Sequence, residues 1–181
     1  MEPLHGHLLI ASPSIFDPNF RRTVVLLTAH AEEGAVGLIL NRRLEATVAE
    51  AVPQLAELAG ADSPLFAGGP VNPNGVSMLA EFDDPSEAGV EVFDDIGFVA
   101  LDAALEGDPP ALRRRRVFAG VASWGAGQLE GELESDDWIV EAARNDDVFS
   151  DDADALWENV LQRMGGTYAV VARMPFDPSL N

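Results

Sequence analysis

One stretch organises the rest of this chain: Val117-Phe-Ala-Gly-Val-Ala-Ser-Trp-Gly-Ala-Gly-Gln-Leu-Glu-Gly-Glu-Leu133. Its first seven residues are mostly small or β-prone, which predicts a strand. Gly125 and Gly127 permit a tight or left-handed turn, and Leu129 and Leu133 are four residues apart, as on one face of a helix. The stretch therefore predicts a strand, a glycine turn and a helix in succession.

Apolar and β-branched runs elsewhere predict further strands, and helical spacing of apolar residues predicts further helices. We expect strands at 7–11, 23–29, 35–40, 65–67, 76–81, 138–142 and 168–172, and a hairpin of 90–93 with 97–101. We expect helices at 47–58, 102–106 and 151–164, the last with aspartates in its first turn and with Gly165-Gly166 at its end.

The order of these elements predicts one α+β domain over residues 1–181. No repeat, low-complexity linker or shift in composition divides the chain. The strands come in clusters with helices placed irregularly between them, whereas a parallel βαβ fold would alternate them regularly.

Composition limits the classes of protein that this chain can belong to. Its 181 residues, 47% of them hydrophobic, can bury a sizeable core. Its apolar runs are far shorter than the ~20 residues of a membrane span, and an acid stands where a signal peptide carries positive charge, so we expect a cytoplasmic protein and no membrane contact. The absence of cysteine excludes disulfides, thiolate metal sites and cysteine nucleophiles.

The charge is strongly negative. The chain has 31 acidic and 11 basic residues, all of the latter arginine, which gives a net charge of -20. Such a charge repels nucleic acid at long range, and genome composition or salt adaptation accounts for it most simply.

Several blocks of the sequence resemble one bacterial family, the AlgH/YqgE family. Its signature is similar to the segment from Trp124 to Glu130, Trp-Gly-Ala-Gly-Gln-Leu-Glu. Its opening resembles residues 8–13, 20–27 and 37–42, its middle resembles 66–71, and its tail resembles 175–181. The resemblance covers essentially the whole chain, in order.

The resemblance implies a fold and a possible role. The fold is α+β, with a bent or branching mixed β-sheet and a small barrel-like part, surrounded by helices. The role often given to the family is that of a transcriptional regulator, which acts with or without direct DNA contact.

Three catalytic or ligand-binding motifs are present only in part. The glycines after residue 124 sit where a dinucleotide fingerprint would be, but Glu130 replaces the third glycine. Ser123 has half of a nucleophile elbow, with His30 as the one plausible partner. His5 and His7 lack a third ligand at metal-site spacing. We therefore expect a structural turn, no catalytic residue, no cofactor and no metal.

The candidate ligand site is a cleft near the glycine turn. Positive charge is confined to the neighbourhood of residues 17–43, where polar side chains lie at predicted strand ends. We expect a small anionic or aromatic ligand there, because arginine binds anions well and amides at a helix start can hold a small anion. The predicted lining is Arg22, His30, Asn41, Arg42, Trp124, Gly125, Gly127, Gln128 and Glu130. Pairing of the arginines with acids across the sheet is the simpler alternative.

The sequence thus favours a binding or regulatory protein whose partner is a small anionic ligand or another protein. A regulator that contacts DNA is one alternative, for which Arg113–Arg116 is the only strongly basic run. We do not expect direct DNA binding, because acidic stretches flank that run. An enzyme with acid–base chemistry at His30 or Glu130 is the other alternative.

Overall fold

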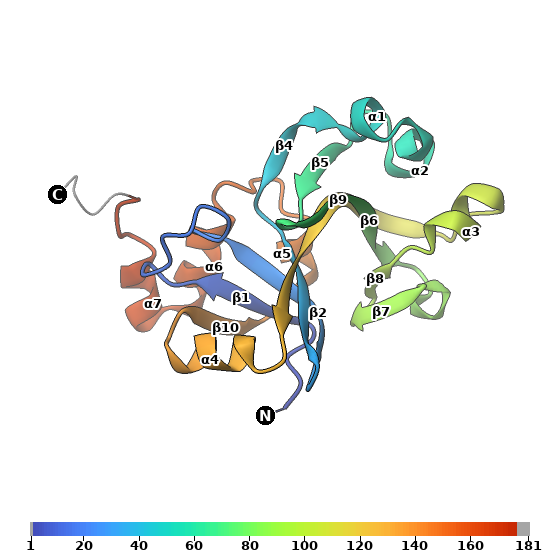
Figure 1. The fold of residues 1–181 in the computed structure, drawn as a ribbon. Helices are drawn as coiled ribbons and strands as arrows, with labels where there is room; N and C mark the ends of the chain where they lie inside the picture. The colour runs from blue at the N-terminus through green and yellow to red at the C-terminus, as the bar shows by residue number, and fades with distance from the viewer. Residues whose placement is uncertain (1, 177–181) are drawn as a thin grey trace.

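The longest strand, β9 (Leu112–Gly125), is the centre of the computed structural model, which describes residues 2–176 (Figure 1). Along its length β9 pairs antiparallel with β6 and β3 and parallel with β5. One ten-stranded sheet therefore holds the chain together, in the order β10-β1-β2-β3-β9-β6-β8-β7, with β4 and β5 branching from it. The bent, branching mixed sheet and the α+β class are confirmed, and this strand path is open, not a closed barrel.

The other strands are β1 (His7–Ala11), β2 (Val24–Ala31), β3 (Gly34–Ile39), β4 (Arg43–Thr47), β5 (Pro64–Ala67), β6 (Val71–Phe82), β7 (Val90–Phe93), β8 (Ile96–Phe98) and β10 (Trp138–Ala142). The helices are α1 (Val48–Ala51), η1 (Pro53–Leu55), α2 (Ala56–Ala59), η2 (Pro85–Glu87), α3 (Leu101–Glu106), α4 (Gln128–Glu134), α5 (Asn145–Val148), α6 (Leu156–Met164) and α7 (Gly166–Val171), where η marks a 3-10 helix. No helix among these residues is long and apolar enough to cross a membrane.

The bend in β9 depends on glycine. Gly120 has φ +77°, and a Cβ atom there would lie 2.3 Å from the carbonyl oxygen of Gly69. A Cβ atom on Gly69 would lie 2.1 Å from the carbonyl carbon of Val121. Only bare backbone fits at this crossing, and it lets β9 leave β6 and continue beside β3.

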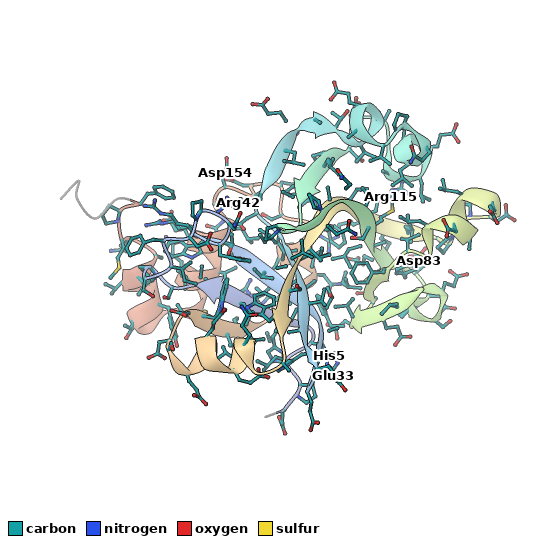
Figure 2. All side chains as sticks on the ribbon, in the orientation of Figure 1. His5, Glu33, Arg42, Asp83, Arg115 and Asp154 are labelled. Atoms are coloured by element: carbon teal, nitrogen blue, oxygen red, sulfur yellow. The ribbon has the colours of Figure 1, made fainter. Side chains whose placement is uncertain are left out.

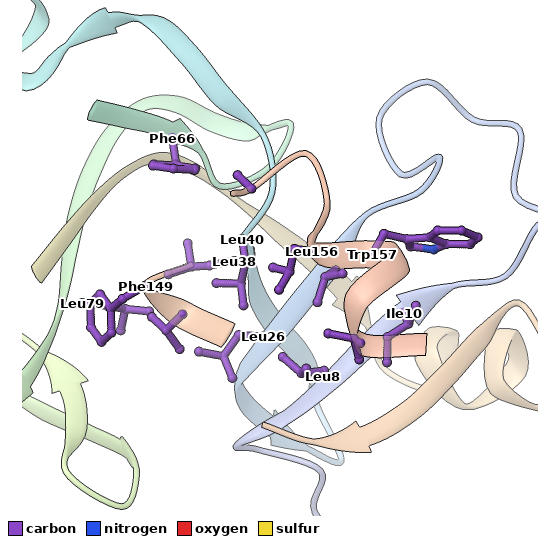
Figure 3. Packing of buried hydrophobic residues seen from close by; sticks show 14 of the residues in the cluster. Leu8, Ile10, Leu26, Leu38, Leu40, Phe66, Leu79, Phe149, Leu156 and Trp157 are labelled. Carbon is purple, nitrogen blue, oxygen red and sulfur yellow. The ribbon is translucent and has the colours of Figure 1, made fainter. Parts of the chain in front are cut away.

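Strands β1 and β2 separate two hydrophobic cores because successive side chains point to opposite faces. Leu8 and Ile10 face the core covered by α6, which Figure 3 shows with Leu156 and Phe149. Leu9 and its neighbours face a second core that contains Trp124, Leu129 and Trp138 and is covered by α4. A third core lies between α1–α3 and the first half of β9.

Most predicted elements are present, with corrections. The helix predicted at 47–58 is divided into α1, η1 and α2, and the second hairpin strand, predicted at 97–101, ends at Phe98. The strand predicted at 168–172 is wrong: these residues belong mostly to α7, which starts directly after Gly165 turns the chain with φ +74°. The helix predicted from residue 151 begins only at Leu156, so the aspartates before it lie in a turn. Strand β4 and helix α5 were not predicted, because both are short and polar.

Candidate functional site

The nine predicted site residues do not meet in one cleft: Arg22, Asn41 and Arg42 lie at the start of β2, whereas the pair of His30 and Glu130 lies near its end. Arg22 precedes the first residue of β2, whereas His30 is near its end, and six residues of strand alone span roughly 20 Å. Arg42 and Glu33 mark the two ends in Figure 2. The single cleft that we expected is therefore divided: Arg22, Asn41 and Arg42 line one cavity, and His30 and Glu130 line another.

The signature turn is held by a carboxylate that the sequence did not single out. The Nε1–H groups of Trp124 and Trp138 donate to the same oxygen, Oε2 of Glu132, at 2.9 and 2.7 Å. Gln128 donates to the other oxygen at 3.1 Å and accepts from the amide of Gly125. Both indoles are more than nine-tenths buried. Trp124 and Gln128 thus connect α4 to the sheet.

Gly127 supplies the backbone shape of this turn. It precedes α4 in the left-handed conformation, with φ +74° and ψ -5°. No neighbouring atom within 4 Å would meet a Cβ atom at Gly127, so its lack of a side chain follows from its positive φ and not from crowding. Gly125 has neither a close neighbour at the Cβ position nor a positive φ. This agrees with the structural turn that we expected.

His30 forms a pair with Glu130. Its Nδ1 accepts a hydrogen bond from the amide of Leu4 at 3.0 Å, which leaves Nε2 as the donor to Oε1 of Glu130 at 2.9 Å. The hydrogen bond from His30, helped by the backbone amide of Glu130, lowers the pKa of that carboxyl. With both ring nitrogens engaged, neutral His30 has no lone pair to accept a proton from a substrate or from Ser123.

The other group lines a cavity of about 470 Å³ at the start of β2. This volume falls within the range of roughly 300–1,000 Å³ typical of small-molecule sites. We call the cavity the arginine cleft. Its lining is Phe16, Pro18, Arg21, Arg22, Asn41, Arg42, Asp154, Trp157, Glu158 and Phe176.

Asn41 and Arg42 build the wall of this cleft. Oδ1 of Asn41 accepts from the amide of Val24, and its Nδ2 donates to the carbonyl of Arg22, both at 2.9 Å. Nη2 of Arg42 donates to the carbonyls of Arg21 at 2.7 Å and Pro18 at 3.2 Å. Asn41 is therefore a scaffold residue, 9% exposed, that fixes the backbone carrying the arginines.

Aromatic rings hold the other two guanidinium groups. The guanidinium of Arg22 lies 4.3 Å from the centroid of Trp157, and that of Arg21 lies 3.8 Å from the centroid of Phe176. Arg22 also donates to the carbonyl of Met174, and Arg21 to that of Phe176. Such stacking and hydrogen bonding fix the cations in place before any ligand arrives.

Burial sets the electrostatics of the cleft, as it does at Arg116, whose pKa it also lowers. Burial lowers the pKa of Arg22 and of Arg42; at Arg22, Arg21 lowers it further and Glu158 opposes the change. Within residues 2–176 no carboxylate lies within 4.0 Å of the guanidinium groups of Arg21, Arg22 or Arg42. These guanidinium groups are therefore partly buried without a carboxylate in contact to neutralise their charge.

The basic run 113–116 is mostly engaged within the protein. Arg113 pairs with Glu81, Asp83 and Asp95, and Arg114 pairs with Glu81 and Asp146. Arg116 donates to two carbonyls and stacks 4.3 Å from the ring of Phe66. Arg115 is exposed. Three of the four arginines are thus engaged inside the protein.

Sequence reasoning missed several residues of the arginine cleft. Arg21 was visible as the neighbour of Arg22, but its share in the cleft depends on the turn that Asn41 fixes. Trp157, Asp154 and Glu158 are more than a hundred positions away, at or just before the start of α6. Phe176 reaches the cleft from the opposite end of the chain, and no local pattern indicates such a contact.

Comparisons with known proteins all point to one protein family. A sequence model of a family described as AlgH-like matches residues 8–169. A UPF0301 protein of Streptomyces coelicolor is 42% identical over 98% of this chain and 95% of its own length, and one of Chlorobaculum tepidum is 37% identical over 97% and 95%.

Two solved structures are similar over nearly the whole chain. A crystal structure of a protein from Corynebacterium diphtheriae has a TM-score of 0.85 at 28% identity and covers 95% of this chain and 93% of its own. The solution structure of the AlgH protein from Pseudomonas aeruginosa has a TM-score of 0.73 at 27% identity, with coverage of 96% and 95%.

Proposed function

We propose that this chain, which belongs to the AlgH-like family, is a binding protein for a small anionic ligand held in the arginine cleft. Its ligand has a carboxylate or phosphate group, which guanidinium groups recognise through paired N–H donors. Regulation, on this proposal, is exerted through occupancy of the cleft and not through contact with DNA.

One observation carries the proposal: three guanidinium groups meet at one cavity without a carboxylate within 4.0 Å among residues 2–176, in a protein of net charge -20. Among the described residues, three of the eleven arginines, Arg113, Arg114 and Arg163, pair with a carboxylate, so the cleft is distinguished by the gathering of three arginines without such a partner at one cavity. Because the three cleft arginines have no carboxylate partner, they form a positive site in a negative protein. Such a site attracts an anion.

The cleft has donors to spare for such a ligand. A guanidinium group has five N–H donors. The carbonyl contacts involve one terminal nitrogen each of Arg21, Arg22 and Arg42. Further N–H groups can reach an anion while the scaffold bonds stay in place.

The experiment is a thermal-shift and calorimetric titration with 3-phenylpropionate and with inorganic phosphate as probes. Either probe at ~100 times its dissociation constant should add about 2.7 kcal/mol of stability, a shift of several degrees in Tm. Arg42→Ala should remove the shift. Arg115→Ala, the same charge change at an exposed position, should retain it. The proposal fails if neither probe binds, or if Arg42→Ala binds as wild type does.

The alternative of a DNA-contacting regulator makes a different prediction. It requires duplex binding that weakens with salt and is lost when Arg113–Arg116 are neutralised. The engagement of Arg113, Arg114 and Arg116 with this chain's own carboxylates and carbonyls argues against it. Salt-sensitive duplex binding that survives Arg42→Ala would favour it over the anion site.

A further inference from the structure

We infer that the ligand of the arginine cleft is an α-amino acid with a large apolar side chain, an inference that rests on the function proposed above. The cleft offers three kinds of surface, one for each part of such a molecule. The cationic wall is Arg21, Arg22 and Arg42, the anionic wall is Asp154 and Glu158, and an apolar pocket adjoins both arginines at positions 21 and 22.

The anionic wall gives the cleft a second charge to satisfy. Asp154 and Glu158 line the same cavity as the three arginines, and Figure 2 shows Asp154 on the same side of the molecule as Arg42. Gln162 donates to Oε1 of Glu158 at 2.8 Å and so restrains that carboxylate. A ligand that carries only an anion would leave these carboxylates unpaired and near its own charge. A ligand that also carries an ammonium group would pair with them.

The apolar pocket is a separate cavity of about 200 Å³ beside the cleft. The two cavities share the lining residues Phe16, Arg21, Arg22 and Phe176. A dry cavity of about 150 Å³ can hold benzene, so this pocket has room for a phenyl-sized group. Its further lining is Ser12, Pro13, Ile15, Met174 and Pro175.

Two exposed aromatic rings border both cavities. Phe16 is 61% exposed and Phe176 is 59% exposed. Exposed rings gathered at one concave place are typical of a binding surface, whereas single exposed apolar residues need no explanation. An apolar side chain placed between these rings would cover surface that the folded chain leaves in water.

The arrangement excludes simpler ligands of the same size. An inorganic anion would use the cationic wall and leave the apolar pocket empty. An aromatic amine would meet three guanidinium groups of its own charge sign. An amino acid with a small side chain would satisfy both charged walls without filling the pocket. Only a zwitterion with an apolar body uses all three surfaces.

The experiment is a calorimetric titration of the full chain with L-phenylalanine and three analogues, each of which lacks one part. N-acetyl-L-phenylalanine has no ammonium group, phenethylamine has no carboxylate, and L-alanine has no ring. We expect L-phenylalanine to bind at least tenfold more tightly than each analogue, since each lost charge-assisted hydrogen bond or buried ring is worth about one decade or more.

Two carboxylate variants test the anionic wall directly. Glu158→Gln keeps the shape and the acceptor for Gln162, so we expect it to fold as wild type does. It should bind L-phenylalanine and N-acetyl-L-phenylalanine with affinities within about threefold of each other, because the group that recognises the ammonium has lost its charge. Glu57→Gln, at an exposed position of α2, is the matched control and should keep the tenfold preference.

The outcomes separate this inference from the anion site beneath it. If N-acetyl-L-phenylalanine and 3-phenylpropionate bind as tightly as L-phenylalanine, and Arg42→Ala removes all three, the amino-acid inference is overturned and the anion site stands. If Glu158→Gln keeps the full preference, the ammonium is bound elsewhere and the inference is again overturned. If no carboxylate or phosphate probe binds at all, both proposals fall together.

Discussion

Trp138 donates its Nε1–H to Oε2 of Glu132 at 2.7 Å, and Trp124 donates to the same oxygen at 2.9 Å. Removal of the carboxylate would leave two indole N–H groups without a partner at nearly buried positions. Each buried unsatisfied donor costs about 1–3 kcal/mol, so Glu132→Ala should lower the free energy of unfolding by about 2–6 kcal/mol. Urea denaturation measures this loss.

A neighbour on α4 gives the control for that variant. Glu134 is exposed and lies in the same helix, so Glu134→Ala makes the same chemical change without touching either indole. It should alter the free energy of unfolding by less than about 0.5 kcal/mol. Equal losses in the two variants would contradict the role assigned to Glu132.

Two glycines of the signature stretch should respond in opposite directions to alanine. Gly120→Ala places a Cβ atom 2.3 Å from the carbonyl oxygen of Gly69, at φ +77°, and should cost about 3 kcal/mol or more, or prevent folding. Gly131→Ala meets no atom within 4 Å inside α4 and should stabilise the protein by about 0.5–1 kcal/mol. Thermal melts of both variants check the sign, and a stable Gly120→Ala protein would refute the account of the bend.

The pair of His30 and Glu130 predicts a dependence of stability on pH. The pKa of Glu130 is lowered in the folded state, so its stabilising contribution is fully present above the ordinary value of 4.5 and is lost as pH falls through the folded pKa. Glu130→Gln should therefore be less stable than wild type at pH 6, and the difference should shrink at pH 3. Urea midpoints at the two pH values measure it. A difference that grows toward pH 3 would contradict the sign.

Trp157 should report occupancy of the arginine cleft by its fluorescence. Its ring lies under the guanidinium of Arg22, whereas Trp124 and Trp138 belong to the core beneath α4. On the proposed function, a bound anion changes the emission of wild type, and Trp157→Phe abolishes that change. The variant also loses the hydrogen bond from Nε1 to the carbonyl of Ala11, a cost of about 1 kcal/mol. A response that persists in Trp157→Phe would mean that the ligand binds elsewhere.

Local pattern was enough to predict most elements of the fold. Apolar and β-branched runs predicted β1, β2 and β3, and the glycines after Trp124 predicted the turn before α4. The local pattern failed where tertiary contacts set the secondary structure. Helix α7 has the β-branched composition of a strand but is helical, because the turn at Gly165 lets it pack beside α6.

The candidate site was harder to predict because its parts are distant in sequence. The signature residues looked like ligand-binding groups, but Trp124 donates its hydrogen bond to Glu132. Glu132 lies among other acids in its helix, so the sequence made it look like a surface residue. The arginines were recognised, but β2 runs between Arg22 and His30 and keeps these two predicted site residues apart. The carboxylates and rings of the cleft come from α6 and the chain end, and pairing over such separations is set by tertiary packing alone.

The crossing of Gly69 and Gly120 also limits which substitutions evolution can accept at these two positions. A side chain at either glycine would clash with backbone atoms, so a change at the other glycine could not relieve the clash. Surface substitutions away from such contacts usually change stability little. At this crossing no single step is open, and we expect the pair to be inherited intact or to be lost together with the fold.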